Sequence, residues 1–194
     1  MKTCGAAEEA TLSAWFAAAT PDPDTAVNLW REYPHRARRL WCGVTFDIVM
    51  ADRSLIAVAY RLLAKYEQPL GPAVQFTSLR SAAVLVPAGT AQKWQGLMAT
   101  AQWPERRPRP VCLSTGHRII VPAPLPAGWL VQWLEPPDVE QGIGGIPLLT
   151  SPAPLARCIT EAKALLGPPP RPPLRRTVSA SSFRSLLHSP QRTL

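Results

Sequence analysis

The sequence predicts an α+β domain in which helices pack on a mixed or mainly antiparallel sheet. Hydrophobic residues make up 46% of the 194 residues, which is enough for a globular body. Helical and strand patterns are interspersed along the chain without a regular β-α repeat, and this favours the α+β class. We expect an N-terminal arm over 1–13, one domain over 14–167, and a disordered tail rich in Pro, Arg and Ser over 168–194.

The first half of the domain alternates helix, extended chain and helix. Apolar residues at helical spacing predict a short helix within 1–20. Asp22 is a good N-cap and is followed by proline, so a helix is predicted over 23–33. Residues 38–50 are rich in apolar and β-branched side chains and are predicted to be extended, with a turn in the middle. Asp52 then caps a second amphipathic helix.

The second half predicts short strands around one helix, and then a closing helix. Two strands around a turn are followed by a helix with an apolar stripe, two more short strands around a second turn, and a strand of alternating apolar residues. Ser151 caps the last helix. These elements are predicted over 73–78, 82–87, 89–102, 110–113, 118–121 and 128–134, with the last helix starting after Ser151.

The formal charge of +8 is unevenly distributed. Residues 168–194 contain five arginines and no acid, residues 104–110 add a net +2, and the remaining body is about neutral. A basic tail and loop attract DNA or RNA in a salt-dependent way. A genome rich in G and C would explain the same enrichment in arginine and proline without any such partner. The candidate nucleic-acid contacts are Arg106, Arg107, Arg109, Arg171, Arg175 and Arg176.

The cysteines, histidines and apolar runs exclude several classes of protein. No two cysteines have zinc-like spacing and the histidines are isolated, so no metal site and no cofactor are predicted. No apolar run is long enough for a membrane span, and acidic residues near the start argue against a secretion signal. We therefore expect a cytoplasmic protein with free thiols and no membrane partner. Four tryptophans are candidates for stacking on bases, although their spacing favours core packing: Trp41, Trp94, Trp129 and Trp133.

Several segments, taken in order, resemble the bifunctional primase-polymerase domain family. Residues 19–24 (Ala-Thr-Pro-Asp-Pro-Asp), followed by a helix with Trp30, resemble the family's T-x-D-P-D turn and its first helix. Residues 46–50 resemble the first catalytic strand, 71–89 the central hairpin, and 116–124 the glycine-containing strand and its V-P-x-P turn. The resemblance covers about residues 14–166 and implies a primase-polymerase-like fold.

The same resemblance implies a degenerate active site. Family members hold Mg²⁺ or Mn²⁺ with two carboxylates on the first strand and a third before the glycine turn, and a hairpin histidine contacts the nucleotide phosphates. Here Asp47 stands on the first strand, but Met50 and Cys112 occupy the other two metal-ligand positions and Arg80 lies on the hairpin. A thioether and a thiol do not replace hard oxygen ligands. Mg²⁺ or Mn²⁺ is therefore expected only if activity survives.

The functional hypothesis is a non-catalytic protein that associates with nucleic acid or with replication machinery. The alternative is a protein–protein interaction or regulatory module that retains only the fold and binds its partner through residues 168–194. An active metal-dependent primase or polymerase is the least favoured option.

Overall fold

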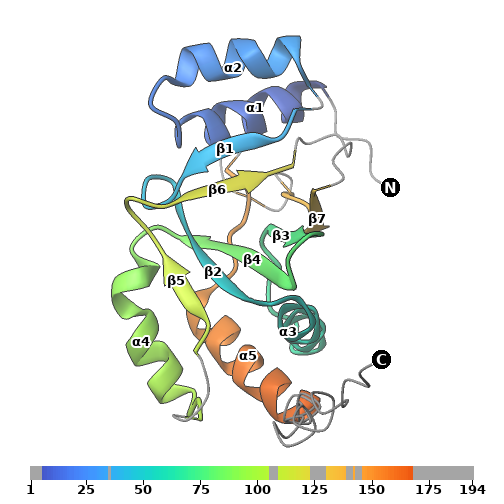
Figure 1. Ribbon diagram of the computed structural model, residues 1–194, viewed down its shortest axis with the longest axis vertical. Coiled ribbons are helices and arrows are strands. Elements are labelled where there is room, and N and C mark those ends of the chain that lie inside the picture. The colour runs from blue at the N-terminus through green and yellow to red at the C-terminus, as the bar shows by residue number, and fades with distance from the viewer. Residues whose placement is uncertain are drawn as a thin grey trace, which may run out of the picture.

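The computed structural model describes residues 6–34, 36–104, 109–122, 130–138, 142 and 146–167. The predicted tail over 168–194 lies outside these residues. Within them the chain forms five helices and seven strands (Figure 1). The helices are α1 Ala6–Ala17, α2 Pro23–Glu32, α3 Arg53–Lys65, α4 Thr90–Thr100 and α5 Pro152–Leu166. The strands are β1 Arg38–Trp41, β2 Phe46–Asp52, β3 Ala73–Phe76, β4 Ser81–Pro87, β5 Val111–Leu113, β6 Arg118–Val121 and β7 Val131–Glu135.

The strands form two antiparallel sheets. The larger sheet has the order β5-β2-β4-β3-β7, and β1 and β6 form a separate two-stranded ribbon. Every strand pairing in the described part of the chain is antiparallel. The predicted α+β class, with helices flanking an antiparallel sheet, is confirmed.

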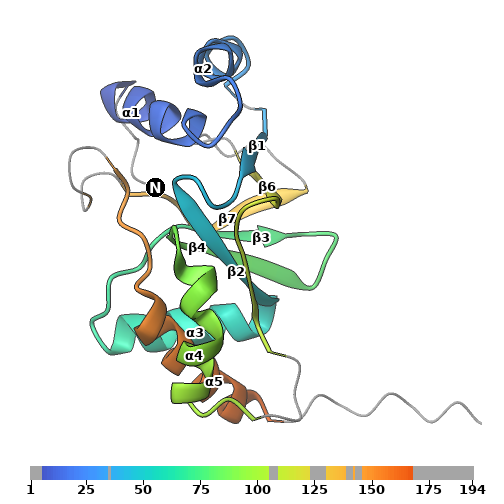
Figure 2. The same cartoon turned by 90° about the vertical axis from the view of Figure 1, so that its left-hand side faces the viewer.

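The five-stranded sheet has a hydrophobic core on each face. Helices α3, α4 and α5 cover one face, while α1, α2 and the β1–β6 ribbon cover the other (Figure 2). Side chains alternate along β2, so Val49 packs toward the three helices while Ile48 packs toward the ribbon. The residues of β2 are therefore divided between two separate environments, and this division decides where the candidate site residues lie.

Local signals explain the helix starts. The Asp22 side chain accepts a hydrogen bond from the Thr25 N–H at 3.1 Å, and Asp52 accepts one from the Ser54 N–H at 2.8 Å. Both predicted N-caps are confirmed. Ser151 precedes α5 as predicted but makes no side-chain cap hydrogen bond.

Helix α1 matches the short helix predicted within 1–20. Helix α1 begins at Ala6, so it runs through the boundary expected between residues 13 and 14. Leu12 is buried in the ribbon-side core, and Ser13 accepts a hydrogen bond from the buried Arg38 at 3.2 Å. The second half of the expected arm is thus packed against the domain. The bounds of an alanine-rich helix are hard to predict because its apolar stripe is weak in the sequence: alanine occurs both in the core and on the surface.

A buried hydrogen-bond cluster joins α3 to the segment before α5. The Tyr60 hydroxyl donates to the Gly71 carbonyl oxygen at 2.9 Å and lies 3.2 Å from the Thr150 hydroxyl, which accepts the Gly71 N–H at 2.9 Å. A Cβ at Gly71 would lie 2.2 Å from the Thr150 nitrogen, so only glycine allows this approach. The cluster holds α5 against the helix-covered face of the sheet.

None of the described helices is both long enough and apolar enough to cross a lipid bilayer.

Candidate functional site

Asp47 caps a helix that is distant from it in sequence. Its side chain is fully buried on β2, and Oδ2 accepts the Ala91 N–H of α4 at 2.9 Å. Gly89 precedes α4 with a φ of +85° and has no side chain to cap the helix. The carboxylate therefore satisfies an N–H that the helix itself leaves unbonded, and it lies at the positive end of the helix dipole. Oδ1 is buried without a hydrogen-bond partner among the described residues.

Two cysteines lie close to Asp47. Cys112 is opposite Val49 on the neighbouring strand β5, and Cys42 directly follows β1. Burial, with the nearby Asp47 charge adding to it, raises the pKa of Cys42 to about 11 and that of Cys112 to about 12. Both thiols are therefore protonated at neutral pH, and a protonated thiol is neither a strong nucleophile nor a metal ligand.

Met50 points away from Asp47. The two residues are three positions apart on one strand, so their side chains emerge on opposite faces of the sheet. Met50 packs against the ribbon-side core, whereas Asp47 faces α4. The two positions that the resemblance pairs on the first catalytic strand do not share one environment.

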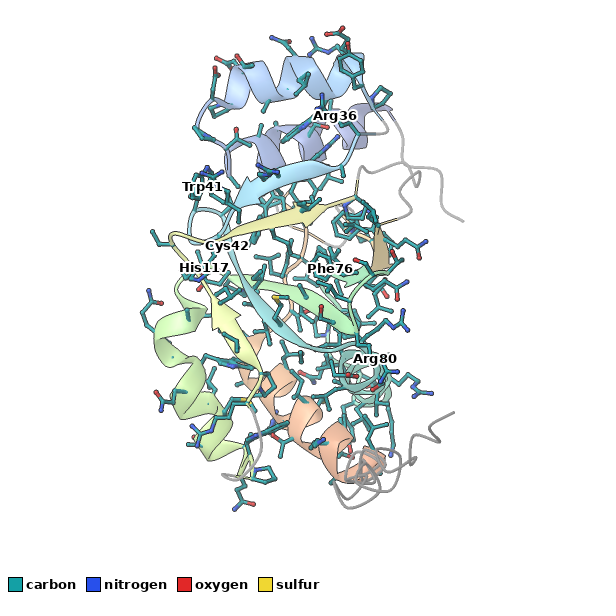
Figure 3. The ribbon with its side chains drawn as sticks, viewed as in Figure 1. Arg36, Trp41, Cys42, Phe76, Arg80 and His117 are labelled. Atoms are coloured by element: carbon teal, nitrogen blue, oxygen red, sulfur yellow. The ribbon has the colours of Figure 1, made fainter. Side chains whose placement is uncertain are left out.

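Arg80 lies at the other end of β2. It is exposed in the turn between β3 and β4, and its carbonyl accepts the Arg53 N–H at 2.8 Å. Burial raises the pKa of the nearby Asp52, but hydrogen bonds from Ser54 and Leu55 and the Arg80 charge outweigh it, so this pKa is lowered. Asp52 is five residues from Asp47 along the strand, or roughly 16 Å. Figure 3 shows Arg80 and Cys42 at opposite ends of the sheet.

The structure thus brings Asp47 and Cys112 together and leaves Met50 and Arg80 apart from them. Within the described ranges, no three His, Cys, Asp or Glu side chains are grouped so that they could hold a metal ion. Among the candidate nucleic-acid contacts, Arg109 is half-buried just before β5. The others, Arg106, Arg107, Arg171, Arg175 and Arg176, lie outside the described residues.

A different surface combines basic and aromatic side chains. In the β1–β6 ribbon, Arg39 pairs with Ile120 and Trp41 pairs with Arg118. Arg39, Arg118 and Ile120 are exposed and Trp41 is half-buried. The intervening residues Leu40, Ile119 and Val121 are buried in the ribbon-side core, together with Arg38. We call the outward set of Arg39, Trp41, Arg118 and Ile120 the ribbon face.

Trp41 and Arg118 are stacked on the ribbon face. The guanidinium carbon of Arg118 lies 3.8 Å from the centre of the Trp41 ring, within the range of a cation–π contact. Further exposed basic groups flank the strands, since Arg36 lies just before β1 and His117 just before β6. Figure 3 shows Trp41 and His117 at the same end of the ribbon.

Backbone contacts fix the end of the ribbon that carries this stack. The Trp41 N–H donates to the Ala19 carbonyl at 2.8 Å, and the Cys42 N–H donates to the His117 carbonyl at 3.0 Å. Gly43, with a φ of +87°, lies against the next turn, where a Cβ would come within 2.5 Å of the Thr115 nitrogen. A side chain is therefore excluded at Gly43 both by its backbone conformation and by this close approach.

Sequence reasoning missed the ribbon face because its members come from segments far apart in the chain. It placed basic charge only in the tail and in the loop over 104–110, and favoured core packing for Trp41. Trp94 is in the core, where its indole N–H donates to the Pro110 carbonyl at 2.8 Å, and Trp133 is partly buried against the ribbon-side core. Trp129 lies outside the described residues. The sequence did contain a signal of a locally basic surface. No acidic residue occurs between Arg36 and Asp47 or between residues 106 and 134, the two segments that contain β1 and β6.

Comparisons with protein-family models, with curated proteins and with solved structures found no match to this chain. The resemblance to primase-polymerase domains therefore stays a prediction.

Proposed function

We propose that this chain is a non-catalytic nucleic-acid-binding domain of primase-polymerase-like descent. The ribbon face carries the proposal, because two exposed arginines and an aromatic ring share one surface of paired strands. Arginine suits phosphate oxygens through its planar set of donors, and aromatic rings suit bases. An association with replication machinery is suggested only by the family resemblance.

The environment of Asp47 supports a non-catalytic role. Its Oδ2 already accepts the Ala91 N–H of α4, and the two thiols whose pKa its charge helps to raise, Cys42 and Cys112, are protonated at neutral pH. Two-metal nucleotidyl transfer needs several carboxylate oxygens around the ions. Met50, on the opposite face, supplies none.

The loop and the tail add positive charge outside the ribbon face. Arg109 lies next to β5, and the remaining arginines of the loop and of residues 168–194 add positive charge that acts over long range. We propose a cytoplasmic location, and the free thiols of Cys42, Cys112 and Cys158 support it because a reducing compartment preserves them.

The test is salt-dependent binding of the full chain to labelled single-stranded and duplex DNA, measured by fluorescence anisotropy. Arg39→Gln with Arg118→Gln should weaken binding and lower the salt slope by about 0.7 for each single-strand phosphate contact removed. The matched control is Arg53→Gln with Arg80→Gln, which removes the same charge at the other end of the sheet. Absence of binding at low salt, or equal losses in both pairs, would refute the proposal.

One observation favours the interaction module as a second candidate. Leu165 and Leu166 are 67% and 43% exposed at the end of α5, directly before residues 168–194. A protein partner captured by the full chain, retained after nuclease treatment and lost on deletion of 168–194, would support this function. Loss of the partner on nuclease treatment would instead favour binding through nucleic acid.

A further inference from the structure

The Trp41–Arg118 stack presents a flat cation that lies against an aromatic ring. The two residues are direct cross-strand partners, so the indole and the guanidinium emerge side by side. Trp41 is half-buried and its backbone is tied to Ala19, which restricts the indole. One side of the Arg118 guanidinium lies over this ring at 3.8 Å, while the side chain as a whole is exposed to solvent.

A group of this shape is complementary to another flat, electron-rich ring. A guanidinium stacks on aromatic faces as well as bonding at its edge, and holding it in place lowers the entropy lost on binding. Ile120 is 41% exposed on the same face and adds apolar surface, while Arg39 beside it supplies a second positive charge. The ribbon face therefore offers a place for a ring next to places for anions.

Nucleobases with their phosphates have this combination, but only when the bases are accessible. In a duplex each base face is covered by its neighbours in the stack, whereas a single strand exposes its bases to aromatic side chains and arginine planes. We propose that the ribbon face binds single-stranded nucleic acid in preference to duplex, with one base stacked on the Trp41–Arg118 pair and adjacent phosphates near Arg39. This inference rests on the proposed function and specifies its ligand.

The pair has a competing structural explanation, because a cation–π contact across two strands also stabilises a ribbon. The two explanations differ for Arg118→Lys. Lysine keeps the charge and the strand pairing but has no planar group to stack between an indole and a base. A purely structural pair predicts no change in the preference among ligands, whereas a stacking platform predicts that the preference is lost.

The experiment compares three labelled probes of equal length with the full chain: oligothymidylate, an abasic single strand with the same phosphates, and a duplex. The wild-type protein should bind oligothymidylate at least about fivefold more tightly than the abasic strand, and more tightly than the duplex. Arg118→Lys and Trp41→Leu should each reduce this ratio to below about twofold. Arg39→Gln should weaken binding to both single strands by the same factor. Thermal unfolding of each variant reports whether the fold is retained.

The outcomes separate this inference from the proposed function. If no probe binds with salt dependence, the proposed function itself fails. If all probes bind but the abasic strand or the duplex equals oligothymidylate, the function stands and base stacking is overturned. Base stacking is also overturned if Arg118→Lys keeps the full preference. The wild-type comparison needs no variant, so the inference is tested even if Trp41→Leu fails to fold.

Discussion

Replacing Asp47 by alanine distinguishes a helix cap from a disused metal ligand by the sign of the stability change. The substitution removes the acceptor of the part-buried Ala91 N–H, which is 2.9 Å from Oδ2. Loss of a cap costs about 1 kcal/mol, and loss of the favourable charge at the helix start adds up to about 1 kcal/mol. Removing the buried Oδ1, which has no partner among the described residues, offsets a part of this. We expect a net loss of about 1–2 kcal/mol.

The assay is thermal unfolding followed by circular dichroism, and each kcal/mol corresponds to a shift in Tm of about 2–4 °C for a body of this size. Asp47→Asn is the matched control, because an amide oxygen still accepts the Ala91 N–H and only the charge is lost. The asparagine variant should therefore lose less than the alanine variant. An alanine variant as stable as the wild type, or more stable, would refute the cap, because removing a buried charge with no structural role is neutral or stabilising.

Three further changes test the packing around the sheet. Gly71→Ala should cost more than about 2 kcal/mol in urea unfolding, because the new Cβ would lie 2.2 Å from the Thr150 nitrogen; an unchanged midpoint contradicts this. Tyr60→Phe should cost about 1–2 kcal/mol, since the Gly71 carbonyl loses its buried donor, and an unaltered Tm would show that the cluster is dispensable. Cys42 and Cys112 have pKa values raised from 9.0 to about 11 and about 12, so the folded state holds their protons more tightly than the unfolded state. Their contribution to the free energy of unfolding should be constant below pH 9 and fall as the pH rises toward 12; replacing both by alanine should flatten that decline, and an unchanged profile contradicts it.

The helices could be predicted because their signals are local. Asp22 and Asp52 each bond a backbone N–H two or three residues away, so the cap and the helix it starts are read in one stretch of sequence. The cap from Asp47 to Ala91 crosses 44 positions, and no local pattern marks it. An acid inside an apolar strand therefore resembled a vestigial catalytic residue, although it bonds a helix whose own capping position is a glycine.

The ribbon face could not be predicted for a related reason. Its two strands pair residues such as Trp41 and Arg118, which are 77 positions apart, and nothing in either segment specifies the other as its partner. Once the strands are paired, the alternation of side chains decides which residues form the ribbon face, because each strand directs one set of residues into the core and the other set to solvent. The register of pairing therefore determines which arginine is exposed to solvent.

Arg38 and Arg39 show why the net charge of the body is a poor guide to where positive charge is exposed. They are neighbours with identical side chains, yet Arg38 is 1% exposed and its guanidinium lies 4.3 Å from the centre of the Trp30 ring, whereas Arg39 faces solvent. The buried cation packs between α1 and α2 and is screened from ions in solution, while the exposed one can release counterions when it meets a phosphate. A shift of the strand by one residue would exchange the two roles. Strand register thus decides which basic side chains of the ribbon are exposed, and the nearly neutral sum over the body is compatible with a locally basic ribbon face.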